Sequence, residues 1–399
     1  MEPATLALLV IGIIIAVLFN VVNGRNDAPN TIAIILATRA LSPLPAKLLA
    51  AACCLVGPFI FSTAIAKTIG TNLVDVSVLT PVLLLTGLCG GICWMLLCAK
   101  VGLPVSSSHA LVGGILGAGI AAGGFAAVVW PSLDTVLHMF LYLGCGTVIG
   151  AVCGFLLSLP LRDSKKIFTI IGAVAGFVGA VPFAMICLDF AFGGILAILL
   201  FICVSPMLGL FVSYLITTVL SGMTARFVKN PMKLNKWFQR LQIVGSAFQA
   251  LSLGGNDAQH AMGIIYALLI SVGLVGAGED IPFWVIAVSA VAIMVGLFMA
   301  VKKVLRRVGS GITHLTPYQG FSASLAAGTV LSFMVSFGVP VSSTHLTSGS
   351  IMGTGVTKGV GAVNWKNVRS IVGAWIITIP CSAVVSFAAY MVIKLVFGV

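Results

Sequence analysis

Two short polar motifs interrupt the apolar stretches of this sequence, and each contains an adjacent asparagine and aspartate. GRNDA at residues 24–28 recurs as GGNDA at 254–258. An ionised carboxylate in the middle of a membrane costs several kcal/mol, so it is usually paired or functional. With a neighbouring amide oxygen and backbone carbonyls freed where glycines let the helix unwind, it makes an oxygen cage suited to a hard cation such as sodium. The predicted sodium ligands are Asn26, Asp27, Asn256 and Asp257.

The alternative role for these aspartates is structural, as a helix cap or in a salt bridge. Arg25 could pair with Asp27 in the first motif. The second motif has Gly255 in the place of this arginine. A basic partner common to both motifs is therefore missing, and cation binding is the sharper interpretation.

A second pair of motifs, PVSSSH at 104–109 and PVSSTH at 340–345, suits ligands of the opposite charge. Proline is pre-organised for a first helical turn, and the hydroxyl and free backbone N–H groups beside it can bind an anion at the helix N-terminus. Two such ends could surround a tetrahedral oxyanion without a lysine. The residues concerned are Ser106, Ser107, Ser108, Ser342, Ser343 and Thr344. The first serine of each motif, Ser106 or Ser342, is also assigned to the cation sites.

Other polar residues are secondary candidates. His109 and His345 could carry protons, although such a histidine more often hydrogen-bonds a carbonyl at a helix interface. Four polar side chains lie one to two turns before the Asn-Asp motifs, and they are Asn20, Asn23, Gln249 and Ser252. Of these, Asn23 and Gln249 are assigned to the anion. Asp189 is expected at the outer end of a span, where it would be merely interfacial.

The composition indicates which solvent surrounds the elements that carry these motifs. Hydrophobic residues make up 60% of the 399 residues and charged residues 8%, against about a quarter charged in soluble domains. Most of the surface must therefore face lipid. The net charge of +12 does not indicate a nucleic-acid partner, because the basic residues lie in short clusters between apolar stretches, as the positive-inside rule predicts.

The expected fold is an all-α polytopic membrane protein with about twelve transmembrane helices. A helix needs about 20 apolar residues to cross the hydrocarbon core. The candidate spans are 5–37, 47–66, 81–99, 104–127, 133–159, 167–188, 190–220, 241–275, 283–301, 318–338, 340–360 and 370–397. The first and the eighth are overlong and broken by a polar motif. The segments 104–127 and 340–360 are rich in glycine and start at proline, so re-entrant hairpins remain an alternative for them.

The charges of the loops predict the orientation. With both termini outside, nearly all of the 21 lysines and arginines fall in cytoplasmic loops, including Arg162, Lys229 and the cluster at 302–307. The acidic pair Glu279–Asp280 then falls outside. One missed crossing would invert every later loop, so this one-sidedness favours an even count of twelve.

The chain contains two copies of one unit. Residues 104–119 recur as 340–355 with nine of the sixteen positions identical. In the count above, the matched spans are seven apart, so they cross in opposite directions, which is typical of transporters with a midplane site between inverted repeats. The expected division is a first repeat at 1–160, two linking helices and a short basic loop at 161–240, and a second, inverted repeat at 241–399.

These residues carry a family resemblance. GRNDAPN and GGNDAQHAMG look like the paired signatures of the Pit-type inorganic phosphate transporters, and the PVSS-[ST]-H repeats and inverted halves are similar too. The likeness covers nearly the whole chain. Arg25 and Pro29 depart from the small residues expected in many members, which puts the equality of the two sites in doubt. The linker at 221–240 is short compared with that of animal members.

The resemblance implies a secondary symporter, not an enzyme, that imports inorganic phosphate with sodium ions by alternating access around a midplane site. It assigns Ser107, Ser108, Ser343, Thr344, Asn23 and Gln249 to phosphate. Sodium is then a co-substrate, and no cofactor is expected. The protein is expected to lie in the lipid bilayer of the plasma membrane. Proton coupling and sulfate remain alternatives, and the sequence leaves open the stoichiometry and the oligomeric state, a homodimer included.

Two other classes of protein compete with this interpretation. An ion channel would need a continuous polar path and no pair of pseudo-symmetric gated sites. An intramembrane hydrolase using serine and histidine would not need an inverted duplicate, and adjacent residues such as Ser108 and His109 need not face each other. Within the transporter class, phosphate uptake under an imposed sodium gradient, compared with uptake under an imposed proton gradient, separates sodium coupling from proton coupling.

Overall fold

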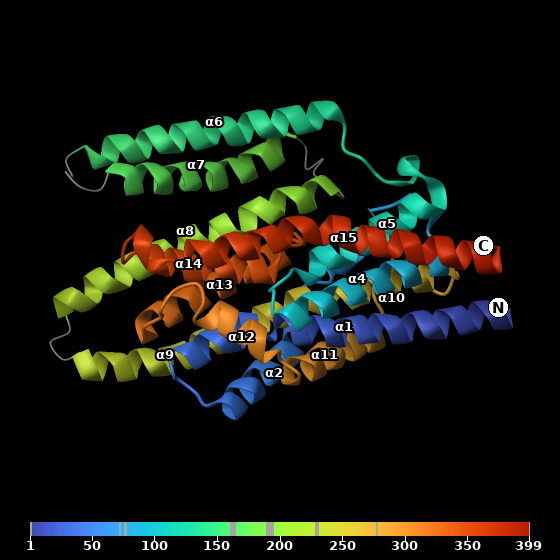
Figure 1. The fold of residues 1–399 in the computed structure, drawn as a ribbon, viewed down its shortest axis with the longest axis horizontal. Coiled ribbons are helices and arrows are strands. Elements are labelled where there is room, and N and C mark those ends of the chain that lie inside the picture. Colours follow the sequence, from blue (N-terminus) through green and yellow to red (C-terminus); the bar gives the residue numbers. More distant parts are fainter. Residues whose placement is uncertain are drawn as a thin grey trace.

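The protein is a bundle of helices that lie roughly along one direction, and its two termini lie at the same end (Figure 1). The computed structural model describes residues 2–71, 73–75, 78–159, 165–188, 195–227, 231–276 and 278–398. Within these ranges the only pairing of extended backbone is an isolated bridge between Val74 and Val128. Arg162, Asp189 and Lys229 lie outside the described residues.

The helices occur in the same order along the chain as the predicted spans and overlap most of them. The first part of the chain forms α1 (Pro3–Ala37), α2 (Pro43–Ile60), α3 (Ala64–Thr71), α4 (Pro81–Val101), α5 (Ser107–Gly123), the 3₁₀ turn η2 (Phe125–Ala127), α6 (Leu133–Ser158) and α7 (Lys165–Cys187). The second part forms α8 (Ile195–Phe227), α9 (Pro231–Asp257), α10 (Gln259–Ser271), α11 (Phe283–Phe298), α12 (Lys302–Gly309), α13 (Pro317–Ser336), α14 (Ser343–Val356), η3 (Val360–Ala362) and α15 (Trp365–Phe397).

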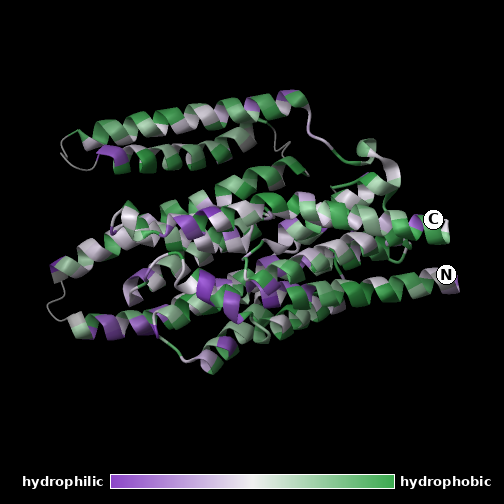
Figure 2. Cartoon of the chain, viewed as in Figure 1, coloured by the Kyte–Doolittle hydropathy of each residue, from purple (hydrophilic) through white to green (hydrophobic). Residues whose placement is uncertain are grey.

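Much of this bundle is long and apolar enough to lie in a membrane. Among the described residues, seven helices meet the length and composition needed to cross a bilayer, or up to eight if the bent pair α11–α12 is one span. Apolar residues run along most of the helices, and hydrophilic ones gather near α12 and at the start of α9 (Figure 2). The chain is therefore a multi-pass membrane protein.

The two PVSS motifs begin helices that are short. α5 has 17 residues and α14 has 14, fewer than the roughly 20 that a crossing requires. They form only part of the segments 104–127 and 340–360, whose crossing of the membrane stays a prediction.

The prediction that both Asn-Asp motifs interrupt their helices is wrong for the first copy. α1 continues through the motif with Pro29 inside it. Pro29 lacks the N–H that would bond the carbonyl of Arg25 four residues earlier, a loss that membrane helices tolerate. Just after the proline, Nε2 of Gln249 donates to the carbonyl of Asn30 (2.9 Å) and joins α1 to α9. In the second copy α9 ends at Asp257, and α10 starts after the single residue Ala258.

Two basic segments expected as loops are helical instead. Within 221–240, α8 continues to Phe227 and α9 begins at Pro231, because lysine and arginine are good helix formers and proline suits a first turn. Residues 302–309 form α12, which bends by 82° from α11 and buries Val304 and Val308.

Each PVSS helix lies against a long helix that contains a proline. α5 packs along α15 and α14 along α8. A side chain at Gly113 would meet the backbone of Ile379, and one at Gly349 would meet the backbone of Pro206. Glycine at these two crossings lets the helix backbones approach each other, as is usual between membrane helices.

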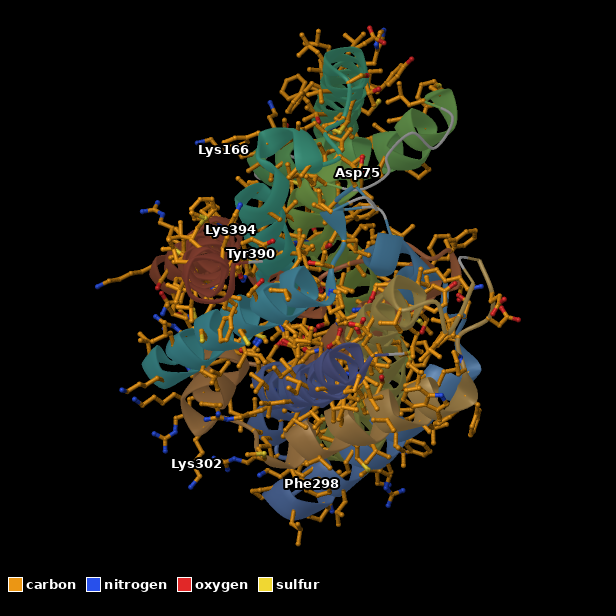
Figure 3. All side chains as sticks on the ribbon, turned by 90° about the vertical axis from the view of Figure 1, so that its right-hand side faces the viewer. Asp75, Lys166, Phe298, Lys302, Tyr390 and Lys394 are labelled. Atoms are coloured by element: carbon orange, nitrogen blue, oxygen red, sulfur yellow. The ribbon has the colours of Figure 1, made fainter. Side chains whose placement is uncertain are left out.

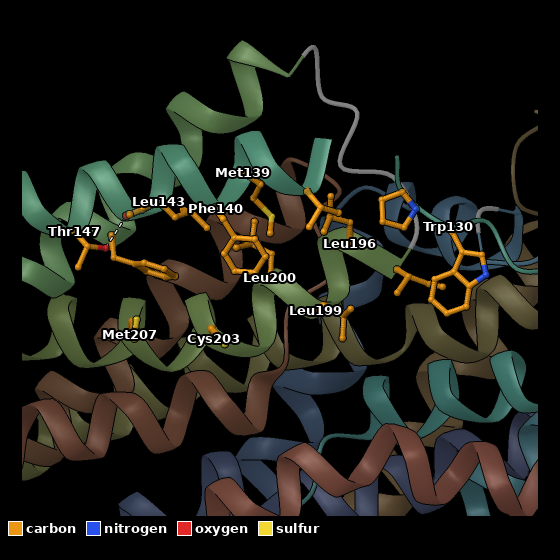
Figure 4. Close-up of a pocket in the computed structure, with 15 residues that line it drawn as sticks. Trp130, Met139, Phe140, Leu143, Thr147, Leu196, Leu199, Leu200, Cys203 and Met207 are labelled. Atoms are coloured by element: carbon orange, nitrogen blue, oxygen red, sulfur yellow. Dashed lines mark hydrogen bonds between the residues drawn. The ribbon is translucent and has the colours of Figure 1, made fainter. Parts of the chain in front are cut away.

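The α6–α7 hairpin lies apart from the rest of the bundle (Figure 1). Its two helices pack through glycines, since a side chain at Gly150 would meet the backbone of Gly172. An apolar cavity of about 630 Å³ separates α6 from α8 and is lined by residues such as Met139, Leu200 and Met207 (Figure 4). None of the candidate ligand residues lines this cavity.

Candidate functional site

Asp27 and the start of α5 form the first half of a buried polar centre. Oδ2 of Asp27 accepts a hydrogen bond from Oγ of Ser107 (2.6 Å). Oδ1 accepts from Nδ2 of Asn26 and of Asn30, both at 3.2 Å. Nδ2 of Asn26 also donates to the carbonyl of Val105 (2.8 Å), so this amide joins α1 to the segment that leads into α5.

Asp257 and the start of α14 repeat this arrangement. Nδ2 of Asn256 donates to Oδ1 of Asp257 (2.6 Å) and to the carbonyl of Val341 (3.1 Å). Oγ of Ser343 donates to Oδ2 of Asp257 (3.2 Å). The repeated sequence motifs therefore make the same contacts twice, with Asn-Asp on one helix and the PVSS segment against it.

Two side chains connect the halves. Oγ1 of Thr344, from the second motif, donates to Oδ1 of Asp27 at 2.7 Å. Nδ2 of Asn30, in α1, lies 3.5 Å from Oγ of Ser343 and 3.1 Å from Oγ1 of Thr344. Because Ser343 also donates to Asp257, a chain of hydrogen bonds runs from one carboxylate to the other. Both carboxylates thus belong to one network.

This centre is closed to solvent and contains two carboxyl groups. Asp27 and Asp257 are each 0% exposed. Neither forms a salt bridge with a described lysine, arginine or histidine. Two buried carboxylates in one network repel each other, and hydrogen bonds from neutral groups compensate only part of their desolvation. The arrangement therefore favours the binding of cations.

Several buried amide oxygens also favour the binding of a cation. Among the described residues, Oδ1 of Asn26, Asn256 and Asn23 and Oε1 of Gln249 accept no hydrogen bond. Buried acceptors are seldom left without a partner. Amide, hydroxyl and carboxylate oxygens are the ligands that hard cations prefer, so these oxygen atoms would suit a hard cation such as sodium.

The first serine of each PVSS motif has a different task in this structure. Oγ of Ser106 accepts from the backbone N–H of His109, and Oγ of Ser342 accepts from that of His345, both at 3.3 Å. These serines are N-caps of α5 and α14. Their assignment to sodium stays a prediction. The free backbone N–H groups in the first turns of α5 and α14 are the positive ends of these two helix dipoles, which favour an anion.

The other predicted residues are all buried near this centre. Nδ2 of Asn23 donates to the carbonyl of Asp257 (3.1 Å) and contacts Nδ1 of His260 (3.4 Å). Nε2 of Gln249 donates to Oγ1 of Thr347 (3.0 Å). Ser108 is 9% exposed. Asn20 donates to the carbonyls of Ala258 and Ser289, and Ser252 pairs with Ser332 and the carbonyl of Gly328.

The two motif histidines meet in the interior. The ring centroids of His109 and His345 are 4.8 Å apart, and that of Trp375 in α15 lies 3.9 Å from His345. Neither Nδ1 of His109 nor either ring nitrogen of His345 has a hydrogen-bond partner among the described residues. This stack links α5, α14 and α15.

Three polar residues of the site were not singled out in the sequence, and they are Asn30, His260 and Thr347. Asn30 is the most important, because it contacts Asp27 and both hydroxyls of the second motif. Its position three residues after Asp27 places it on the same helix face. That spacing was the signal that could have revealed it.

The helices define a multi-pass membrane protein with a buried polar centre formed by two repeated pairs of motifs. The chain belongs to the phosphate transporter family, whose model matches residues 23–168 and 221–386. Members of this family are transporters rather than enzymes. The family model leaves out residues 169–220, which hold most of α7 and α8.

Individual relatives are similar to this chain over almost its full length. A "Probable low-affinity inorganic phosphate transporter" of Rhizobium meliloti is 32% identical, and the match covers 98% of this chain and 99% of the relative. A protein of the same description from Bacillus subtilis is also 32% identical, with 98% and 99% covered. A solved structure of "The sodium-dependent phosphate transporter" is similar with a TM-score of 0.69 and 26% identity, over 98% of this chain and 100% of that one.

Proposed function

We propose that this protein is a secondary active symporter that imports inorganic phosphate together with sodium ions by alternating access. The observation that carries the proposal is the network joining Asp27 and Asp257 to the first turns of α5 and α14. It offers cation ligands and anion donors within one closed centre. The family and the sodium-dependent structural relative support the same substrates.

In this proposal the carboxylates hold sodium with the amide oxygens of Asn26 and Asn256, and with Ser106 and Ser342 as further ligands. Phosphate lies at the starts of α5 and α14, where its ligands are Ser107, Ser108, Ser343, Thr344, Asn23 and Gln249.

The hydroxyls of Ser107, Ser343 and Thr344 donate to the carboxylates in the present structure. A hydroxyl has one hydrogen and two lone pairs. It can therefore face a cation with its oxygen while its hydrogen turns to phosphate, so that each of these groups connects the two kinds of ligand.

The architecture that we propose has twelve spans and two inverted repeats, at 1–160 and 241–399, with 161–240 between them. Its support is the contact-by-contact correspondence of the two halves and the two segments that the family model matches. Placement in the plasma membrane with both termini outside, and a homodimer, stay predictions. The termini at one end of the bundle suit an even number of crossings (Figure 1).

The experiment is uptake of labelled phosphate into proteoliposomes under an imposed sodium gradient and then under an imposed proton gradient. Sodium-driven accumulation above the equilibrium level is expected. Accumulation driven only by protons would replace sodium coupling with proton coupling. Labelled sulfate in the same vesicles is expected to accumulate much less than phosphate, and equal accumulation would overturn the assignment of the anion.

A further inference from the structure

A basic surface forms where the end of α4, the whole of α12 and the start of α15 come together. It consists of Lys100, Lys302, Lys303, Arg306, Arg307, Lys366 and Arg369. None of these seven forms a salt bridge with a described residue. So many like charges on one surface create a strong positive potential that attracts an anion.

Part of this surface is held rigidly. The guanidinium of Arg307 donates to Oδ1 of Asn367 (3.0 Å), to Oγ of Ser370 (3.1 Å) and to the carbonyl of Gly102 (3.2 Å). Nζ of Lys303 donates to the carbonyl of Lys100 (3.1 Å). These contacts fix α12 between α4 and α15. They also place two cationic groups against the carbonyl end of α4, where the helix dipole favours positive charge.

The remaining cations are free to bind a partner. Lys302 and Arg306 lie on the exposed side of α12, and Lys366 and Arg369 are exposed on the first turns of α15. Lys302 points away from the bundle, near the labelled Phe298 at the end of α11 (Figure 3).

Apolar side chains are exposed beside these cations. Val101 is 67% exposed, Leu97 54%, Met299 54% and Phe298 39%. They belong to the last turns of α4 and the end of α11 and the residue after it. A ligand that fits here has an anionic head and an apolar tail, which a free inorganic anion or a nucleotide lacks.

The orientation of α12 suits a membrane interface. It bends by 82° from α11, buries Val304 and Val308 and carries its charges on the other side. A short amphipathic helix with basic residues on its polar face is typical of segments that lie among anionic headgroups.

We propose that this surface binds the phosphate headgroup of an anionic phospholipid through Lys302, Arg306, Lys366 and Arg369, with the acyl chains along α4 and α11. The site is separate from the buried centre that carries transport. α12 nevertheless packs against helices of that centre, because Val304 and Val308 belong to one apolar cluster with Ala33 of α1 and Ile351 of α14. A bound lipid therefore stabilises α12 against the two helices that hold Asp27 and Thr344.

The test measures lipid binding to the purified, detergent-solubilised protein by native mass spectrometry, with phosphatidylglycerol and phosphatidylcholine as probes. The wild type is expected to retain phosphatidylglycerol in preference to phosphatidylcholine. Removing two charges in Lys302→Gln/Arg306→Gln should weaken the binding of phosphatidylglycerol by about 30-fold. The pair Lys366→Gln/Arg369→Gln should have a similar effect.

The control variant removes two positive charges from a different part of the surface. Lys165 and Lys166 are exposed at the start of α7, and Lys165→Gln/Lys166→Gln should leave lipid binding unchanged. An equal loss in the control would show general charge attraction and overturn the site. Displacement of the lipid by millimolar inorganic phosphate would assign the surface to a free anion instead. Because binding is measured without transport, failure of the proposed symport would not affect this result.

The effect of the bound lipid on transport is measured separately, as phosphate uptake in proteoliposomes. Phosphate uptake by the wild type should be faster in vesicles that contain phosphatidylglycerol than in pure phosphatidylcholine. The Lys302→Gln/Arg306→Gln protein should lose this difference and keep its uptake in phosphatidylcholine. Stimulation of equal size in both proteins would contradict a regulatory role for the lipid at α12.

Discussion

Replacing Asp27 by asparagine separates the charge of this side chain from its hydrogen bonds. Oδ1 of Asp27 accepts from Asn26, Asn30 and Thr344. The amide oxygen of an asparagine can keep these three contacts. Oδ2 accepts from Ser107, whose hydroxyl can turn to accept from the new amide N–H, because a hydroxyl both donates and accepts. Asp27→Asn should therefore fold and lose only the negative charge.

The missing charge sets the size of the expected effect on sodium binding. For a cation about 5 Å from the carboxylate and an effective dielectric constant of about 20, Coulomb's law gives about 3 kcal/mol. This corresponds to a loss of sodium affinity of about 100-fold. Asp257→Asn should behave in the same way, since Asp257 accepts from Asn256 and Ser343 and has no basic partner among the described residues.

The assay is the sodium dependence of labelled phosphate uptake in proteoliposomes, with the melting temperature in detergent as the check of folding. Asp134→Asn is the matched control, because Asp134 lies exposed in the first turn of α6. It should keep wild-type sodium dependence. If folded Asp27→Asn and Asp257→Asn proteins also keep it, the carboxylates are structural caps and the reasoning from buried charge is refuted.

Three further predictions concern topology, packing and the anion. In a cysteine-free background, Lys236→Cys should react with an impermeant reagent only from the cytoplasm and Glu279→Cys only from outside; labelling from one side would contradict twelve spans. Gly349→Ala places a methyl group against the backbone of α8 and should destabilise the protein by roughly 2 kcal/mol, seen as a lower melting temperature, whereas Gly373→Ala meets open space and should not. Ser107→Ala removes one donor and should weaken phosphate binding in calorimetry by about tenfold; unchanged phosphate affinity would remove Ser107 from the phosphate ligands.

The polar centre could be predicted from the sequence because its parts are repeated. Charged and amide side chains in apolar stretches are costly, so their recurrence in two motifs indicates a common site. The structure brings Asn26, Asp27, Asn256 and Asp257 into contact with the PVSS segments as the motif pairing suggested. The hydropathy pattern likewise predicts most helix positions, since it depends only on local composition.

The remaining features depend on contacts between distant segments. Whether α1 breaks at its motif depends on its packing against other helices, since Gly24 lies against the backbone of α11 and the helix continues through Pro29. The bend between α11 and α12 follows from the burial of Val304 and Val308 against other helices. No local pattern reveals that Thr344 of one half donates to Asp27 of the other.

The most direct measurement of the shared site is isothermal titration calorimetry of phosphate binding in detergent, in sodium-free and in sodium-rich buffer. Phosphate at neutral pH carries between one and two negative charges and would lie next to Asp27 and Asp257. Two helix N-termini supply only about half a positive charge each, so bound sodium must supply the rest. Phosphate affinity should therefore rise steeply with sodium, and sodium affinity should rise by the same factor with phosphate. Phosphate binding of equal strength in both buffers would contradict a site shared by the two ions.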